Sequence, residues 1–253
     1  MKISIVTATY NREDTISDSL KSLRRQTFSN YQHIIQDGAS TDGTLDIINN
    51  LSDSRTRLAS ETDTGIYDAL NRGIKRASGD IIGLMHSDDF FASDTVLEKV
   101  AAAFSDTSTD GVYGDLQYVS ASNPERIIRH WRAGKYTSKR LKYGWMPPHP
   151  TLYLRREVFE NWGCYDTSYQ IAADYDAMLR WLVRGKITLA YIPEVLVKMR
   201  VGGESNKSLG RIIRKSREDY RAIRSNGVGG LGTLVMKNTR KIRQFFERGK
   251  QQQ

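Results

Sequence analysis

Apolar and polar positions change their spacing in a regular order along the first ninety residues. Short apolar runs typical of strands buried on both faces are followed by segments with apolar residues every three or four positions, as on one helix face. We expect strands at 3–7, 33–36, 58–60 and 81–85, and helices at 16–23, 45–51 and 66–77. This alternation predicts an α/β fold with a single doubly wound, mostly parallel, Rossmann-like sheet.

The pattern is less regular after residue 90. Further strands are expected at 112–119 and 189–192, and a helix at 174–183. Two more helical patterns follow, at 209–223 and 231–246, separated by a glycine-rich hinge. We therefore expect one domain at 1–205, with halves of about 1–90 and 91–205, and a helical tail at 206–253.

Charge separates this tail from the rest of the chain. The 253 residues carry a formal net charge of +9, yet residues 206–253 alone hold 13 lysines and arginines against 3 acidic residues. Leucines and phenylalanines share one face of the pattern at 231–246, and basic residues, Lys237 among them, surround the rest. A basic amphipathic helix of this kind suits a membrane interface. We expect it to bind an anionic membrane surface, and its few aromatic residues do not favour nucleic acid.

The expected location follows from the remaining composition. No apolar run approaches the roughly 18 residues that a membrane-spanning helix needs, and the first residues resemble a strand more than a signal peptide. The single cysteine, Cys164, excludes an internal disulfide. These features predict a cytoplasmic protein, peripheral on the inner face of the membrane.

Polar residues gather where three of the predicted strands end, at 10–13, 37–42 and 87–89. Ligands of doubly wound sheets bind beyond the carboxyl ends of the strands. In the third cluster, Asp88 and Asp89 are adjacent carboxylates whose mutual repulsion a divalent cation would relieve. Mg²⁺ and Mn²⁺ are often shared between one or two carboxylates and substrate phosphates. The pair therefore predicts a metal and diphosphate site, with an ordinary acidic turn as the alternative.

The second cluster indicates a nucleotide. Asp37 ends a predicted strand, where its carboxylate could accept an N–H group of a nucleobase. Asp42 and Thr44 are better explained as residues that order the loop and cap the next helix.

Five segments, in order, resemble the family 2 glycosyltransferases of GT-A fold over roughly residues 1–205. Each segment alone is a weak signal, but five in order at suitable spacing are a strong one. They are Ser-Ile-Val-Thr-Ala-Thr-Tyr-Asn-Arg-Glu (4–13), Asp-Gly-Ala-Ser-Thr-Asp-Gly-Thr (37–44), Gly-Ile-Tyr-Asp-Ala-Leu-Asn-Arg-Gly (65–73), Ser-Asp-Asp (87–89) and Ala-Asp-Tyr-Asp-Ala-Met-Leu-Arg (173–180).

The resemblance implies a role for each of these segments. Asp88 and Asp89 match the metal-binding acidic motif, with Asp88 also near the donor. Asp174 matches the general base that deprotonates an acceptor hydroxyl, which then displaces the nucleoside diphosphate with inversion. The nucleotide-sugar site would include Ala8, Tyr10, Glu13, Asp37 and Asn71. Asp176 is the rival base, and a helix N-cap is the alternative role for Asp174.

Several positions depart from the family pattern. Ala173 stands where the first acid of the acidic pair is usual, and Gly38 where a second acid follows Asp37. The late histidine near the diphosphate is absent, and Arg200 could contact the diphosphate instead or form a surface salt bridge. His149, in the proline-rich run 146–150, could meet the acceptor or be structural.

The expected function is therefore sugar transfer from a nucleotide-sugar to a lipid-linked or oligosaccharide acceptor, with Mg²⁺ or Mn²⁺ as cofactor, in polysaccharide assembly. A sugar-phosphate nucleotidyltransferase is the alternative enzyme, although the glycine-rich N-terminal loop of that family is missing here. A nucleic-acid-binding module that uses the basic tail is the alternative outside enzymes.

Overall fold

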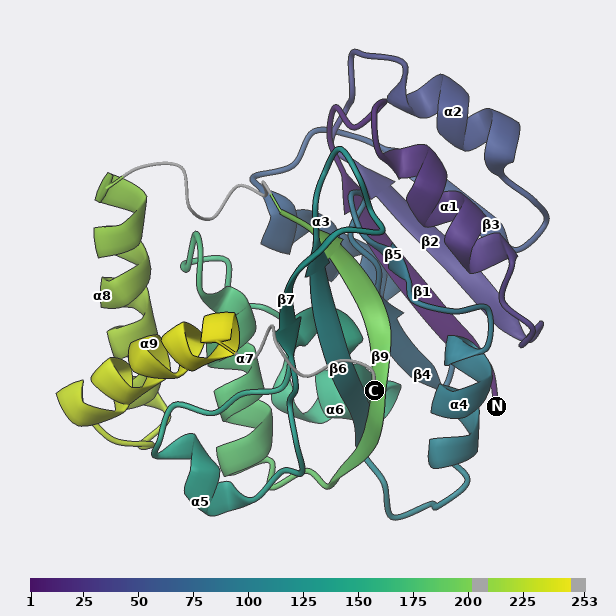
Figure 1. Ribbon diagram of the computed structural model, residues 1–253. Helices are drawn as coiled ribbons and strands as arrows, with labels where there is room; N and C mark the ends of the chain where they lie inside the picture. Colours follow the sequence, from purple (N-terminus) through teal and green to yellow (C-terminus); the bar gives the residue numbers. More distant parts are fainter. Residues whose placement is uncertain (202–208, 247–253) are drawn as a thin grey trace.

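The computed structural model describes residues 1–201 and 209–246, except the side chains of 209 and 241–246. The apolar positions expected at Leu209, Ile242, Phe245 and Phe246 lie outside the described side chains. The first elements are β1 (Ile3–Thr9), α1 (Ile16–Arg24), β2 (Tyr31–Asp37), α2 (Thr44–Leu51), β3 (Thr56–Ser60), α3 (Ile66–Arg76), β4 (Ile81–Leu84), β5 (Phe90–Phe91) and α4 (Val96–Ala103) (Figure 1). Every strand and helix expected before residue 90 is present.

The second half contains short elements that the sequence pattern does not predict. The elements are β6 (Gly111–Val119), β7 (Ile127–Trp131), α5 (Ser138–Leu141), the 3-10 helix η1 (His149–Thr151), β8 (Tyr153–Arg155), α6 (Arg156–Trp162), α7 (Ala173–Leu179) with its π-helical continuation η2 (Arg180–Arg184), β9 (Leu189–Arg200), α8 (Leu209–Ser225) and α9 (Leu231–Phe246). Unpredicted β8 has three residues and β5 has two, which is too short for a periodic signal.

The described strands form one sheet in the order β3-β2-β1-β4-β8-β6-β9-β5, with β7 paired to β6. The first four strands are parallel to one another, and β6 is parallel to β9. The short β8 joins these two groups by antiparallel pairing with β4 and β6. The α/β fold with a mainly parallel sheet is confirmed, and the antiparallel pairs lie in its second half.

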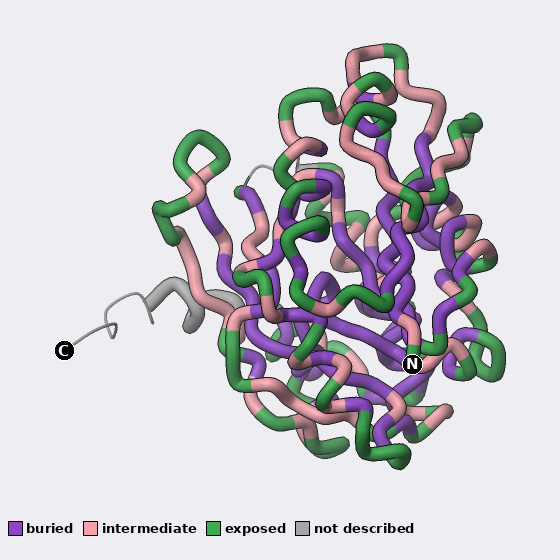
Figure 2. Tube along the Cα trace, turned by 90° about the vertical axis from the view of Figure 1, so that its right-hand side faces the viewer, coloured by how far each residue is buried: buried purple, intermediate pink, exposed green. Residues whose placement is uncertain are grey.

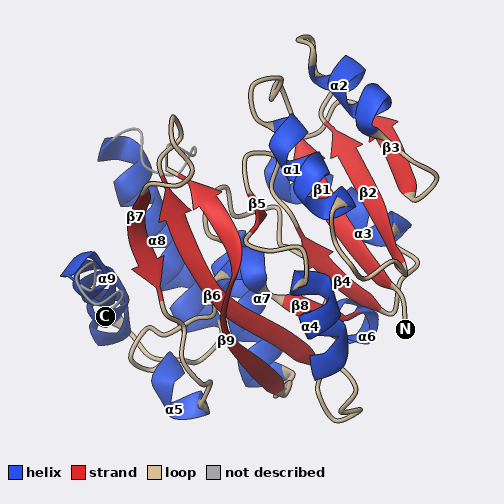
Figure 3. Cartoon of the chain, turned by 45° about the vertical axis from the view of Figure 1, so that its right-hand side comes forward, coloured by secondary structure: helices blue, strands red, loops and turns tan. Residues whose placement is uncertain are grey.

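Helices cover both faces of the sheet because successive residues of each strand point to opposite sides. On one face, Ile3 and Ile5 of β1 pack in a cluster with Leu97 and Val100 of α4. On the other, Val6 packs in a cluster that includes residues of α3, α6 and α7. Figure 3 shows the two layers of helices, and Figure 2 shows the buried residues concentrated in the interior of the molecule.

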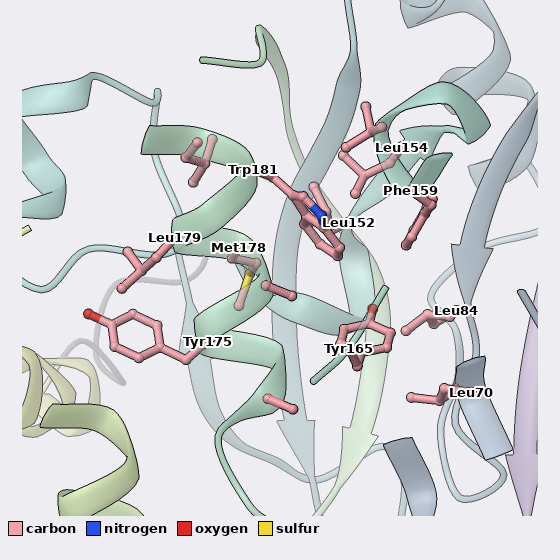
Figure 4. Close-up of a cluster of buried hydrophobic side chains, with 14 of the residues drawn as sticks. Leu70, Leu84, Leu152, Leu154, Phe159, Tyr165, Tyr175, Met178, Leu179 and Trp181 are labelled. Carbon is pink, nitrogen blue, oxygen red and sulfur yellow. The ribbon is translucent and has the colours of Figure 1, made fainter. Parts of the chain in front are cut away.

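The larger cluster contains most of the buried aromatic residues. Trp181, Tyr165 and Phe159 lie in edge-to-face contacts, with ring centroids 5.2–5.9 Å apart. Figure 4 shows these rings beside Leu70 of α3 and Leu84 of β4. This packing fixes α7 against the sheet, close to the ends of the parallel strands.

Helices α8 and α9 form a C-terminal hairpin (209–246) that packs on the domain. Helix α8 lies against α7, and α9 lies against α8 and β7 (Figure 1). Ala222 and Ile223 of α8 are completely buried in the cluster that holds α7. The predicted tail helices are therefore present, and part of their apolar surface is used within the protein.

Lys237 of α9 does not lie on a polar face, so that prediction is wrong. Its ammonium group is 2.5 Å from Asp219 of α8, with both side chains buried, and 3.6 Å from the ring centroid of Tyr175. Burial lowers the pKa of Lys237, and the charge of Asp219 opposes that effect. At Gly144, where φ is +69°, a side-chain Cβ would lie 2.4–2.5 Å from backbone atoms of Lys237, so α9 approaches this turn closely.

None of the helices in the described part of the chain combines the length and apolar character required to cross a bilayer.

Candidate active site at the ends of the parallel strands

The loops that follow β1 and β2 are fastened to each other by hydrogen bonds. Asn11 accepts a bond from the backbone N–H of Thr41 at 2.9 Å, and Glu13 accepts one from Gly43 at 2.7 Å. In return, the backbone N–H of Asn11 donates to the Ser40 hydroxyl. The Glu13 carboxylate thus orders the start of α2, while much of its side chain remains exposed.

Asp37 lies at the end of β2 and is fully buried. Its carboxylate accepts bonds from the backbone N–H of Ser40 at 2.9 Å and from the hydroxyls of Ser40 and Ser60 at 2.5 and 2.6 Å. These bonds fix the entrance of the β2–α2 loop. The proposed contact between Asp37 and a nucleobase stays a prediction.

Ala8 and Tyr10 occupy the end of β1 next to this loop. Ala8 is buried, whereas the side chain of Tyr10 is 55% exposed and accessible to a ligand. A side chain at Gly38 would meet the Asp63 carboxylate at 2.8 Å and Tyr10 at 3.4 Å. The glycine that departs from the family pattern therefore keeps room for Tyr10 and Asp63.

Asp88 and Asp89 lie in the turn between β4 and β5. Asp88 is partly exposed, while Asp89 is completely buried. Burial, followed by the negative charge of Asp88, raises the pKa of Asp89 well above its ordinary value. The repulsion expected between the two carboxylates is thus present in the folded protein.

Arg200, the last residue of β9, holds this turn in place. Its Nη1 donates to the Asp88 carbonyl at 2.8 Å, and its backbone N–H donates to Asp89 Oδ1 at 3.3 Å. Its Nη2 bonds to Asp18 of α1. The Arg200 side chain is buried and lies over the Phe90 ring, while the side chain of its ion-pair partner Asp18 is 53% exposed.

The acidic turn fits a divalent cation. Asp89 Oδ2 is buried and has no hydrogen-bond partner, which is costly for an ionised carboxylate unless a cation compensates it. Within residues 1–201 and 209–246, no three histidine, cysteine or acidic side chains are grouped as a metal cage. A cation bound here would therefore need ligands from a bound molecule as well as from Asp88 and Asp89.

Asp174 lies in the first turn of α7, partly exposed. Its Oδ1 is 3.3 Å from the hydroxyl of Tyr67 in α3, and that hydroxyl is also 2.7 Å from the Ile171 carbonyl. Burial, together with the Asp174 charge, raises the pKa of Tyr67 well above its usual value. Tyr67 therefore keeps its proton, and the proton is shared between the carbonyl and the carboxylate.

Asp176, the rival base, faces a different part of the molecule. Residues two positions apart on a helix point in widely different directions. Asp176 accepts a bond from Asn226 of α8 at 2.9 Å and lies 3.6 Å from Arg180. It lines a cavity of about 370 Å³ together with Arg221. These contacts engage Asp176 in the packing of α7 on α8.

His149 and His86 lie beside Asp174 and Asp88. The His149 Nε2 is 2.8 Å from the Tyr165 hydroxyl, and its ring centroid is 6.1 Å from that of His86. Burial lowers the pKa of His149 to about 4, against the opposing charge of Asp174. Burial also lowers the pKa of His86, against the charges of Asp88 and Asp174. Both rings are therefore neutral near pH 7.

Asn71 has both ends of its amide engaged by the backbone of Tyr165. It donates to the Tyr165 carbonyl at 2.8 Å and accepts from the Tyr165 N–H at 3.0 Å. These bonds tie α3 to the segment between α6 and α7. A direct contact between Asn71 and a nucleotide-sugar stays a prediction.

The predicted residues fall into two groups. Ala8, Tyr10, Glu13 and Asp37 surround the linked loops after β1 and β2. Asp88, His149 and Asp174 form the second group: the charge of Asp174 affects the pKa of both His149 and His86, and the charge of Asp88 affects the pKa of His86. Sequence reasoning assigned no role to His86 or Tyr67, although His86 stands next to the acidic pair and Tyr67 lies within a quoted motif.

Residues 4–168 match the family described as "Glycosyl transferase family 2". A Mycobacterium bovis protein named "PGL/p-HBAD biosynthesis glycosyltransferase" is 32% identical over 209 residues, which cover 80% of this chain and 78% of that protein. The similarity therefore extends over most of both proteins.

Two solved structures share the fold at low sequence identity. S. aureus TarS 1–349 in complex with UDP-GlcNAc has a TM-score of 0.68 and 19% identity, covering 90% of this chain and 66% of that one. The mannosyltransferase PcManGT from Pyrobaculum calidifontis, in complex with GDP-Man and Mn²⁺, has a TM-score of 0.63 and 18% identity, covering 96% of this chain and 64% of that one. The chain thus spans slightly less than two thirds of each of these solved chains.

Proposed function

The chain belongs to glycosyl transferase family 2, and on that premise we propose that it moves a sugar from a nucleotide-diphospho-sugar to an acceptor hydroxyl, with Asp174 as the base. Membership of this family favours sugar transfer over the nucleotidyltransferase alternative. The observation that carries the proposal is the position of Asp174. The Tyr67 hydroxyl contacts its carboxylate, and its negative charge, with that of Asp88, opposes the lowering of the His86 pKa by burial.

The proposed chemistry uses the two oxygens of Asp174 differently. Tyr67 contacts Oδ1, so Oδ2 is the atom we assign to accept the proton of the acceptor hydroxyl. The deprotonated oxygen attacks the anomeric carbon, the bond to the nucleoside diphosphate breaks, and the configuration inverts. The neutral rings of His149 and His86 can orient hydroxyl groups without adding charge beside the base.

Asp88 and Asp89 would hold the divalent cation, whose contribution is to neutralise the charge that develops on the leaving diphosphate. The unpartnered Oδ2 of Asp89 supports this assignment. Arg200 then acts mainly through the protein, because it fixes the acidic turn that would carry the metal. A direct contact from Arg200 to the diphosphate remains part of the proposal.

The donor and acceptor are proposed by class. One structural neighbour binds UDP-GlcNAc and another GDP-Man with Mn²⁺, so both uridine and guanosine donors are candidates. For the acceptor we propose a lipid-linked or growing saccharide, at a membrane face reached by the exposed apolar residues of the C-terminal hairpin. A thermal-shift panel of nucleoside diphosphates with Mn²⁺ would identify the base.

Asp174→Asn tests the proposed base. Loss of a general base lowers turnover by about 10²- to 10⁴-fold, so we expect kcat to fall in that range while donor binding stays unchanged. The measurements are initial rates of sugar transfer and the thermal shift with nucleoside diphosphate and Mn²⁺. Asp176→Asn is the comparison, and a larger loss there than in Asp174→Asn would assign the base to Asp176.

Asp89→Ala tests the metal site. We expect the extra thermal shift that Mn²⁺ adds to the nucleoside diphosphate to disappear, because the buried carboxylate is removed. Asp94→Asn, at an exposed residue paired with Arg25, is the control and should keep the full metal-dependent shift. Unchanged metal dependence in Asp89→Ala would refute the assignment.

A further inference from the structure

We infer that Glu218, on helix α8 of the C-terminal hairpin, is a positioning residue for the catalytic base. Its Oε2 accepts hydrogen bonds from the backbone N–H groups of Ile171 and Ala172 at 2.8 and 3.0 Å, and its Oε1 accepts one from Gln170 at 3.2 Å. A single carboxylate therefore binds three successive backbone donors immediately before α7. Asp174 is only two residues beyond the last of them.

Helix α7 begins without a side-chain cap of its own. The residue before the helix is Ala172, which has no side chain able to cap the first turn, and no side-chain cap bond is formed from within the segment. Unpaired N–H groups at a helix start carry partial positive charge and are stabilised by an anion. Glu218 supplies an anion beside this helix end, bound to the N–H groups of Ala172 and the two residues before it.

A second contact connects the segment that Glu218 binds to Asp174. The Ile171 carbonyl, in the segment that Glu218 binds, lies 2.7 Å from the Tyr67 hydroxyl, which is 3.3 Å from Asp174 Oδ1. The segment before α7 is thus held from one side by Glu218 and from the other by Tyr67. Movement of this segment would shift both Tyr67 and the first turn that carries Asp174.

Helix α8 is itself held firmly enough to act as a support. Next to Glu218, Asp219 is buried against Lys237 of α9. At the end of α8, Asn226 donates to Asp176 of α7 at 2.9 Å. These contacts fix α8 against α9 and against α7, so the position of Glu218 is defined by packed elements on both sides.

The inference rests on the proposed function of Asp174, and it extends the catalytic apparatus to the C-terminal hairpin. A base displaced by about 1 Å can lose on the order of 10²-fold in rate. Among the described residues, the hydrogen bonds of Glu218 go to the segment before α7 and not to the loops after β1 and β2 or to the acidic turn after β4. Its removal should therefore lower kcat and leave the KM for the donor unchanged.

The test is Glu218→Gln in the full chain, with sugar transfer measured against donor concentration. We expect kcat to fall by about 10- to 100-fold with an unchanged donor KM and an unchanged thermal shift with nucleoside diphosphate and Mn²⁺. Glu157→Gln, the same substitution at an exposed position of α6, is the matched control and should keep the wild-type kcat. A kcat within twofold of wild type in Glu218→Gln overturns the inference, as does an equal loss of donor binding.

Tyr67→Phe tests the same positioning of the segment before α7 without a change in α8. It removes the hydroxyl that joins Ile171 to Asp174, and we expect it too to lower kcat at constant donor KM. If Glu218→Gln fails to fold, a wild-type kcat in Tyr67→Phe overturns the inference. Asp174→Asn distinguishes the proposed base from the proposed positioning residue. Normal turnover in Asp174→Asn refutes the role of Asp174 as base. An inactive Asp174→Asn together with a wild-type kcat in Glu218→Gln refutes only the positioning role of Glu218.

Discussion

At the scale of the single residue, two histidines are buried: His33 on β2 and His149 in η1. His33 lies 2.9 Å from the Thr7 hydroxyl, and His149 lies 2.8 Å from the Tyr165 hydroxyl. Burial lowers the pKa of each ring to about 4. Each side chain is therefore neutral in the folded protein and becomes protonated in the unfolded chain near its ordinary pKa.

This difference predicts that acid destabilises the fold. Between pH 6.5 and about 4 the unfolded chain binds a proton at His33 and the folded protein does not, so stability present above pH 6.5 is lost as the pH falls. At pH 5 the loss from His33 is about 2 kcal/mol. Urea unfolding at pH 7 and pH 5 should show a smaller decrease for His33→Gln than for wild type; equal decreases would contradict the prediction.

At the scale of the element, α9 is joined to α8 by a buried ion pair. Lys237 and Asp219 have side chains that are 4% and 2% exposed. Removing one member of such a pair leaves a buried charge without compensation, which costs more than the pair itself contributes. The packing of α9 on α8 within the C-terminal hairpin therefore depends on both members being present.

Lys237→Met is expected to lower the free energy of unfolding by about 3–5 kcal/mol, because Asp219 is left buried and unpaired. The double variant Lys237→Met with Asp219→Leu should recover part of that loss. Chemical denaturation measures both, with Asn238→Ala, at an exposed position of the same helix, as the control. A double variant less stable than Lys237→Met would argue against this account.

The same elements show what the sequence can predict. Long periodic segments such as α3 and the buried strand β1 have a strong local signal, and Asp88 and Asp89 could be placed because a strand end is a local feature. Strand β8 is too short to give such a signal. The partners of Lys237, Tyr67 and Glu218 lie on other elements, so no spacing along the chain predicts them.

At the scale of the whole molecule, basic charge is concentrated at one end of the chain. Among the described side chains of the C-terminal hairpin, the large apolar residues exposed on the surface are Ile212, Ile213, Leu231, Val235 and Met236. Because Ala222 and Ile223 are buried in the shared core, removal of the whole hairpin would damage the domain. Point substitutions are therefore the appropriate test of membrane binding.

We expect the protein to sediment with vesicles that contain acidic lipid and to be released as salt increases. Replacing Ile212 and Ile213 by glutamate should weaken this binding by about tenfold or more, since it removes apolar area and adds repulsion. Neutral vesicles and duplex DNA at the same salt concentration are the controls. Tight DNA binding without vesicle binding would instead support a nucleic acid partner.

The attachment of Arg200 to the acidic turn has a consequence for the order in which the protein is made. Asp18, Asp88 and Asp89 leave the ribosome early, but the residue that fixes them is the last of β9. Strands β1 to β4 contain contacts that are nearer in sequence and can pair first. The acidic turn therefore reaches its final geometry only after about four fifths of the chain has been synthesised, so any function that depends on this turn is acquired late in synthesis.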